Sequence, residues 1–228
     1  MRTERWNVGT MERLIAAVVV LLSIFPSFHL SAQHFSIGPE VAFGDYREVS
    51  SDLRYRGVGG GARATVTWKR FSADVAISKV TYKPTSTGTT TQQFDAREVD
   101  VRLRYYVSGP ISAELGFVNR KADPEFNAQS MGALTAGAHM GYLLGPGVHM
   151  ALSGGLMFGP RFSGGGTISA LGALHLGLGL TVDALRGRLR FNGDYDFQRI
   201  SRKTNGAGGA LPAPIQQALG RAGIAVAF

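Results

Sequence analysis

Apolar and polar residues alternate with a period of two along several stretches of this chain. In residues 98–107, valine, leucine or tyrosine occupies every odd position, while Asp100 and Arg102 occupy even ones. Residues 188–198 repeat the pattern, with Arg, Asn, Asp or Gln at the even positions. A period of two sends successive side chains to opposite faces of a β-strand. Charges at every second residue cannot lie in the core of a soluble sandwich, so these strands face a polar lumen or bulk water.

The same alternation along the whole chain predicts an all-β, closed, antiparallel up-and-down barrel of about ten strands, with eight as the main alternative. Pro39 lies within the first strand and cannot donate a ladder hydrogen bond, so a bulge or irregular pairing is expected there. The expected strands span residues 34–45, 58–69, 71–82, 93–107, 111–119, 132–144, 148–159, 168–182, 187–199 and 215–228. The connections alternate between tight turns and longer loops, as they do in transmembrane β-barrels.

The last strand ends the chain on an aromatic residue. Phe228, Val226 and Ile224 share one face, while Arg221 and small residues share the other. On this strand the chain resembles the outer-membrane β-barrel proteins of Gram-negative bacteria. The resemblance implies a location in the bacterial outer membrane. It also implies that Phe228, Val226 and Ile224 form the signal read by the barrel-assembly machinery, although this family often has a second aromatic where Val226 stands.

Residues 1–32 have the order of a secretory signal peptide. An arginine precedes the apolar run 14–30, and two small residues follow it. We expect cleavage after Ala32, which leaves residues 33–228 as the barrel domain. Met11 is an alternative start. A single anchoring helix is the alternative to a cleaved signal, but a proline and a histidine interrupt the run.

The composition fits a membrane barrel. No stretch after residue 32 offers about 18 uninterrupted apolar residues, so no transmembrane helix is expected. The mean hydropathy is only +0.03, but strands that show alternate residues to lipid do not raise this average. The chain has no cysteine, which excludes disulfides, thiolate metal sites and cysteine nucleophiles. A soluble antiparallel sheet would leave the export signal and the terminal Phe unexplained.

The expected lumen carries most of the candidate chemistry. Its charged members should form an ion-pair lattice, and a ten-stranded barrel is narrow enough for such a lattice to block free diffusion. The expected lumen residues are Glu40, Arg63, Asp74, Asp100, Arg102, Arg104, Glu114, His139, His175, Arg190, Asp194, Asp196 and Arg221. Pairing across the tight turns predicts that Arg104 lies beside Glu114. The aspartates at 194 and 196 are expected to contact His175 or Arg221.

Catalysis and metal binding are weaker interpretations of these residues. Ten-stranded outer-membrane proteases use paired carboxylates and a His–Asp pair near the outer rim. Here Asp194, Asp196 and His175 are the nearest counterparts, but they are expected in mid-barrel, where a general base cannot reach a large substrate. His139 and His175 lack a third metal ligand. The sequence therefore predicts no enzyme, no metal and no cofactor.

The net charge of +8 bears on possible partners. Three Arg and two Glu precede residue 33, so the remainder carries +7. An exported membrane protein seldom meets nucleic acid, so outer-membrane lipid and lipopolysaccharide phosphates are the expected anionic partners, with solvated rim charges as the alternative. The oligomeric state stays open. Basic residues expected outside the barrel are Arg47, Arg54, Arg56, Lys83, Arg120, Lys121, Arg161, Arg202 and Lys203.

Two function classes remain. The first is a structural or surface-interaction barrel with a plugged lumen. The second is a narrow channel or transporter for a small or apolar solute.

Overall fold

The computed structural model describes residues 33–51, 53–85, 92–123, 126, 129–163, 167–206 and 209–228. The expected signal peptide, 1–32, lies outside these residues. Within the described part of the chain, no helix is long and apolar enough to cross a membrane.

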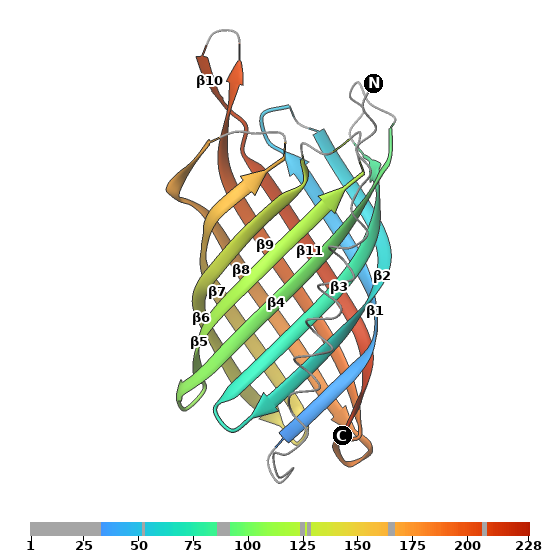
Figure 1. Ribbon diagram of the computed structural model, residues 1–228. Coiled ribbons are helices and arrows are strands. Elements are labelled where there is room, and N and C mark those ends of the chain that lie inside the picture. The colour runs from blue at the N-terminus through green and yellow to red at the C-terminus, as the bar shows by residue number, and fades with distance from the viewer. Residues whose placement is uncertain are drawn as a thin grey trace, which may run out of the picture. The chain divides into compact units, whose positions relative to one another are not determined.

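Ten strands pair antiparallel in chain order, and the last closes onto the first, which confirms the closed ten-stranded barrel (Figure 1). These strands are β1 (Gln33–Glu48), β2 (Leu53–Trp68), β3 (Phe71–Pro84), β4 (Phe94–Ser108), β5 (Ile111–Ala122), β6 (Met131–Gly145), β7 (Val148–Phe162), β8 (Thr167–Ala184), β9 (Leu189–Gly206) and β11 (Ile215–Ala227).

The stretch 200–214, expected as a loop, instead continues the sheet. β9 runs on to Gly206, and the short strand β10 (Gly209–Pro212) pairs back onto it. In Figure 1 this hairpin extends beyond the rest of the barrel wall. β9 therefore continues past the alternating segment 188–198. β10 supplies its hydrogen-bonding partners there.

The two ends of the barrel differ. Connections of a few residues join β2–β3, β4–β5, β6–β7 and β8–β9 at one end, called here the turn end, where the carboxyl terminus also lies (Figure 1). The opposite end, the loop end, carries the remaining connections. All four turns use left-handed backbone. The φ angles are 52° at Lys69, 51° at Gly109 and 72° at Gly147, and the turn after β8 has positive φ at three consecutive residues, 185–187. In outer-membrane barrels such short turns lie on the periplasmic side.

The seam between β1 and β11 closes the barrel. The backbone N–H of Phe228 donates to the carbonyl of Phe35 over 2.8 Å, and the two rings stack with centroids 6.0 Å apart. Pro39 and Gly38 have no partner in the β1–β11 ladder, while the pairs on either side keep one register. The expected irregularity at Pro39 is therefore an interruption of pairing rather than a bulge.

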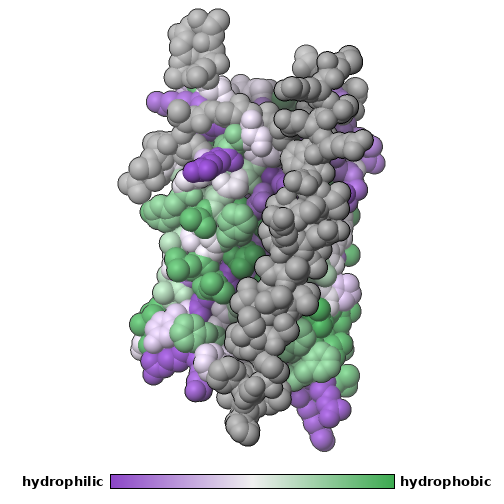
Figure 2. Space-filling model, in the orientation of Figure 1, coloured by the Kyte–Doolittle hydropathy of each residue, from purple (hydrophilic) through white to green (hydrophobic). Residues whose placement is uncertain are grey.

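The outward face is apolar through the middle of the wall and polar toward both ends (Figure 2). Leu115 and Leu134 are 62% and 60% exposed there. Near the turn end, the ring of Phe71 contacts those of Trp68 and Tyr105, with centroids 6.3 and 5.0 Å apart. An apolar band bordered by aromatic residues is the surface that a membrane-spanning barrel presents to lipid.

Candidate functional site

The inside of the barrel is the candidate site, and it changes in character from the loop end to the turn end. Inward side chains along β4 illustrate the order: Phe94 and Ala96 come first, then Asp100 and Arg102, then Tyr106. We call the three zones the apolar layer, the ion-pair layer and the chamber.

The apolar layer fills the loop end of the lumen with two clusters. In the first, the ring of Phe94 packs against those of Tyr55 and Tyr82, each with its centroid 5.0–5.1 Å away, and Tyr46 is 2% exposed. Phe162 packs against both clusters. The first cluster comprises Ala42, Tyr46, Tyr55, Val80, Tyr82, Phe94, Ala96, Ile215 and Leu219. The second comprises Val118, Met131, Ala133, Met157, Ala173 and Ile200.

Arg221 on β11 forms the centre of the ion-pair layer. Its guanidinium lies 3.1 Å from Glu98, 3.2 Å from Asp194, 3.5 Å from Asp100 and 3.7 Å from Glu40. The Arg221 side chain is only 3% exposed. A buried charge is stable only when opposite charges and hydrogen bonds surround it. The four carboxylates supply the opposite charges, and those within 3.5 Å also accept hydrogen bonds from Arg221.

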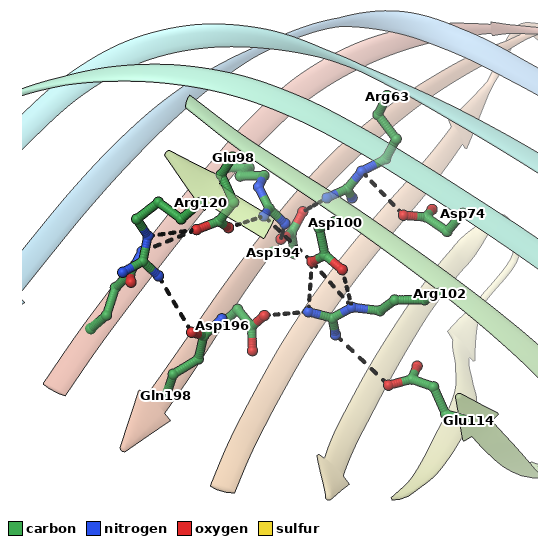
Figure 3. A network of polar contacts seen from close by, with 12 residues as sticks. Arg63, Asp74, Glu98, Asp100, Arg102, Glu114, Arg120, Asp194, Asp196 and Gln198 are labelled. Atoms are coloured by element: carbon green, nitrogen blue, oxygen red, sulfur yellow. Dashed lines mark hydrogen bonds and ion pairs between the residues drawn. The ribbon is translucent and has the colours of Figure 1, made fainter. Parts of the chain in front are cut away.

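Other arginines carry the layer across the lumen (Figure 3). Arg102 on β4 contacts Asp100 over 2.8 Å and also contacts Asp196 on β9, the strand on the opposite wall. Arg63 on β2 reaches Asp194 on β9 over 2.5 Å. These ion pairs therefore join walls that share no backbone hydrogen bonds.

Arg120 on β5 extends the network on its loop-end side. Its Nε donates to Glu98 over 3.1 Å, and its Nη2 donates to Gln198 over 3.4 Å. Gln217 also donates to Glu98, over 3.2 Å. Arg120 was expected outside the barrel but is 3% exposed inside it.

Arg202 was also expected outside the barrel, and it too lies inside. It is 8% exposed, and its guanidinium lies over the ring of Phe162 at 4.9 Å. Both arginines lie on inward positions of strands that continue past the expected loop boundaries, and this explains the error.

The expected neighbour pairs are present in part. Arg104 donates to Glu114 over 2.7 Å, and Asp194 contacts Arg221. The expected contact of His175 with Asp194 or Asp196 is wrong. His175 faces Gln198 across the β8–β9 ladder, whereas the two aspartates face glycines, because the turn after β8 lies two residues later in the chain than expected.

Small residues on the wall opposite β4 make room for the crossing side chains. A Cβ at Gly155 would lie 2.8 Å from Nε2 of His175 and 2.4 Å from the backbone oxygen of Ala136. A Cβ at Gly177 would come within 3.8 Å of Arg102. The glycines of β6–β8 therefore accommodate the ion-pair layer in a barrel of this width.

The chamber occupies the turn end of the lumen and has a volume of about 550 Å³. Turn residues Gly109 and Pro110 line its mouth, and Arg63, Arg102 and Arg221 of the ion-pair layer line its inner end. Its walls combine apolar lining with polar side chains from most strands. They include Thr65, Thr67, Ser72, Asp74, Arg104, Tyr106, His139, Ser153, Thr181, Arg190 and Asn192.

Every expected lumen residue has an inward position. Some of these residues belong to the ion-pair layer and others to the chamber wall. Asp74 and Arg190 lie in the chamber wall, where Asp74 accepts from Thr65 over 2.8 Å and Arg190 donates to Asp183 over 2.7 Å. His139 and His175 are 9% and 3% exposed. Among the described residues, no group of three or more His, Asp or Glu could hold a metal ion.

Sequence reasoning missed Glu98, Gln198, Gln217 and the aromatic residues of the apolar layer. Glu98 has the same parity as Asp100, Gln198 that of Asp196, and Gln217 that of Arg221. Extending the alternation along each strand would have identified all three.

A row of cations crosses the outer surface near the loop end. Lys79, Arg97 and Lys121 face one another on β3, β4 and β5 in consecutive register pairs, and all three are exposed. Asp95 forms an ion pair with Lys79. Asp123 accepts from the backbone N–H of Asp95. The row, called the cation row, lies where the apolar surface of these strands ends.

No family model and no curated protein match the chain. Solved structures do. Neisserial surface protein A is 12% identical, with a TM-score of 0.41 over 85% of this chain and 97% of that one. The outer-membrane protease OmpT of Escherichia coli is 9% identical, with a TM-score of 0.51 over 89% and 98%. The translocator domain of the autotransporter NalP of Neisseria meningitidis is 12% identical, with a TM-score of 0.40 over 96% of each chain.

At these identities the similarity is one of fold. The closed ten-stranded barrel, its apolar outer band and its unequal ends agree with that fold. The protein has the fold of the bacterial outer-membrane β-barrels.

Proposed function

We propose that this protein is a closed barrel that acts as a structural or surface-interaction component of the outer membrane and does not conduct solutes. The observation that supports the proposal most strongly is the presence of two consecutive barriers in the lumen. A solute from the chamber would first meet charged side chains that join opposite walls, and then a packed group of aromatic rings.

Each barrier would be costly to open. Separating Arg102 from Asp196 would leave buried charges unpaired, which costs about 3–5 kcal/mol for a typical buried pair. Side chains of the apolar layer such as Tyr46, Tyr55 and Met157 are almost fully buried, and interiors packed in this way contain few gaps larger than a water molecule. A narrow channel remains the alternative function.

The same arrangement favours a non-enzymatic role. Asp194 and Asp196 are both engaged by arginines, and the buried ring nitrogens of His175 form no hydrogen bond with either carboxylate. A general base must be free to remove a proton from its substrate, and both carboxylates are held in ion pairs with arginines.

Planar-bilayer recording of the refolded protein tests the closed state. We expect no single-channel current from the parent, because neither barrier offers a hydrated path. Regular current steps in the parent would reject the proposal in favour of the channel.

Thiol labelling maps the same barriers in cells, since the chain contains no cysteine. Ser153→Cys lies in the chamber wall, and Ser201→Cys on the exposed surface of β9 is the matched control. A membrane-impermeant thiol reagent should label only the control in intact cells and both variants in isolated membranes.

We also propose that the cation row of Lys79, Arg97 and Lys121 contacts phosphates of lipopolysaccharide. Like charges directly opposite each other across strands repel, and an anionic phosphate beside the row would relieve this repulsion. The row lies at the loop end, which is the outward side in barrels of this class, at the height where the apolar band gives way to polar residues.

Adding lipopolysaccharide to the refolded protein in neutral detergent should therefore raise its Tm by a few degrees. The triple variant K79Q/R97Q/K121Q should lose this rise, while K69Q/R70Q/R186Q, which removes three exposed cations at the turn end, should keep it. Equal shifts in both variants would show that the contact is not local to the row.

A further inference from the structure

We propose that the chamber is a binding site for a small solute bearing a carboxylate or phosphate group, which enters from the periplasm and is held by Arg104. This inference goes beyond the closed barrel, because a lumen sealed at one end can still bind at the other. A volume of about 550 Å³ lies within the range of ordinary small-molecule sites, roughly 300–1,000 Å³.

The carboxylates that line the chamber are already engaged. Asp194 contacts Arg63 and Arg221, and Asp100 and Asp196 contact Arg102. Asp74 accepts from Thr65 over 2.8 Å and lies 3.7 Å from Arg63. A cationic ligand would have to displace an arginine from each of these contacts.

Arg104 differs from the other arginines of the chamber. Its hydrogen bond to Glu114 uses Nε, and within the described residues its two terminal nitrogens donate no hydrogen bond. These nitrogens belong to a side chain that lines the chamber and is 17% exposed. A guanidinium with open Nη groups is the geometry that binds carboxylate or phosphate through two parallel hydrogen bonds.

Polar groups beside Arg104 complete the site. Arg104 pairs in register with Glu114, and His139 pairs with Ser112, so the four residues form one patch over β4, β5 and β6. Nδ1 of His139 and Oγ of Ser112 are buried and have no hydrogen-bond partner among the described residues. Buried polar groups are normally satisfied, and an oxyanion on Arg104 with a bound water would supply a partner for His139, which lines the chamber.

The opening of the chamber at the turn end determines the route by which a solute can reach Arg104. Turn residues line the opening, and the ion-pair layer closes the far end. A solute therefore enters and leaves by the same route, which suits capture or sensing of a periplasmic solute rather than passage through the membrane.

Isothermal titration calorimetry with inorganic phosphate and, separately, with succinate tests the site in the refolded full-length barrel. We expect saturable binding of at least one of the two, with one site per chain. The double variant R104Q/E114Q removes both charges of the pair, so that no unpaired Glu114 remains, and it should weaken binding by about tenfold or more through loss of a charge-assisted bidentate contact. Arg199→Gln, on the exposed outer face, should bind as the parent does.

Heat-modifiable migration on gels checks that each variant is folded before titration. Equal affinity in the parent and R104Q/E114Q would overturn the proposal, as would heat signals that never saturate with either anion. Conductance does not enter this test, so a channel would refute the closed barrel without refuting the anion site.

Discussion

Replacing Arg221 with methionine is expected to lower the free energy of unfolding by about 3–5 kcal/mol. Arg221 is 3% exposed and is the shared partner of Glu40, Glu98, Asp100 and Asp194. Methionine retains much of the volume but leaves four buried carboxylates with fewer cations around them. Urea unfolding of the refolded protein in lipid vesicles, followed by tryptophan fluorescence, measures the loss.

Arg199→Met is the matched control, because it removes an exposed arginine from the outer face and should change stability by less than about 0.5 kcal/mol. Adding Asp194→Asn to Arg221→Met should recover part of the loss by removing one uncompensated charge. A loss of only about 0–1 kcal/mol for Arg221→Met would instead mean that the ion-pair layer is hydrated like a surface pair.

Replacing Phe228 with serine is expected to reduce the outer-membrane level of the protein severalfold in cells, far more than Ala227→Ser. Phe228 is 74% exposed on the outer face, so its ring remains accessible to an assembly factor as well as to Phe35. Ala227 has the opposite parity and points toward the lumen. Membrane fractionation with immunoblotting compares the two variants.

Refolding in detergent separates recognition from folding. Serine keeps the backbone hydrogen bond that joins residue 228 to Phe35, so the purified variant should still fold and show heat-modifiable migration. If Phe228→Ser and Ala227→Ser reach the membrane equally, the terminal residue is not the assembly signal of this chain.

The alternation of side chains was sufficient to predict the ten barrel strands and most of the charged residues that they turn inward. A period of two is a local property, so the parity of Asp100, Arg102 and Glu114 could be read without a partner strand. Tight turns fixed the neighbours as well, which explains why Arg104 and Glu114 were paired correctly. The same reasoning failed for His175, because the turn after β8, at Leu185–Gly187, lies two residues later in the chain than expected.

Contacts across the lumen could not be predicted in this way. Arg102 and Asp196 are 94 positions apart and meet because strand number and stagger set which heights face each other in a closed barrel. The aromatic residues of the apolar layer posed a different difficulty. Tyr46, Tyr55 and Phe94 lie near strand ends, where barrels also place lipid-facing aromatics, and only their parity shows that they point inward.

The pairs that join β4 to β9 also affect the mechanics of the barrel. A sheet closed only by backbone hydrogen bonds can flatten into an ellipse with little change in those bonds. Flattening here would pull Arg102 away from Asp196 or compress it against Gly177 of β8. The ion pairs across the lumen therefore fix the distance between opposite walls. They hold the cross-section close to one shape when the surrounding bilayer changes thickness or lateral pressure, and a scaffold for surface contacts benefits from that rigidity.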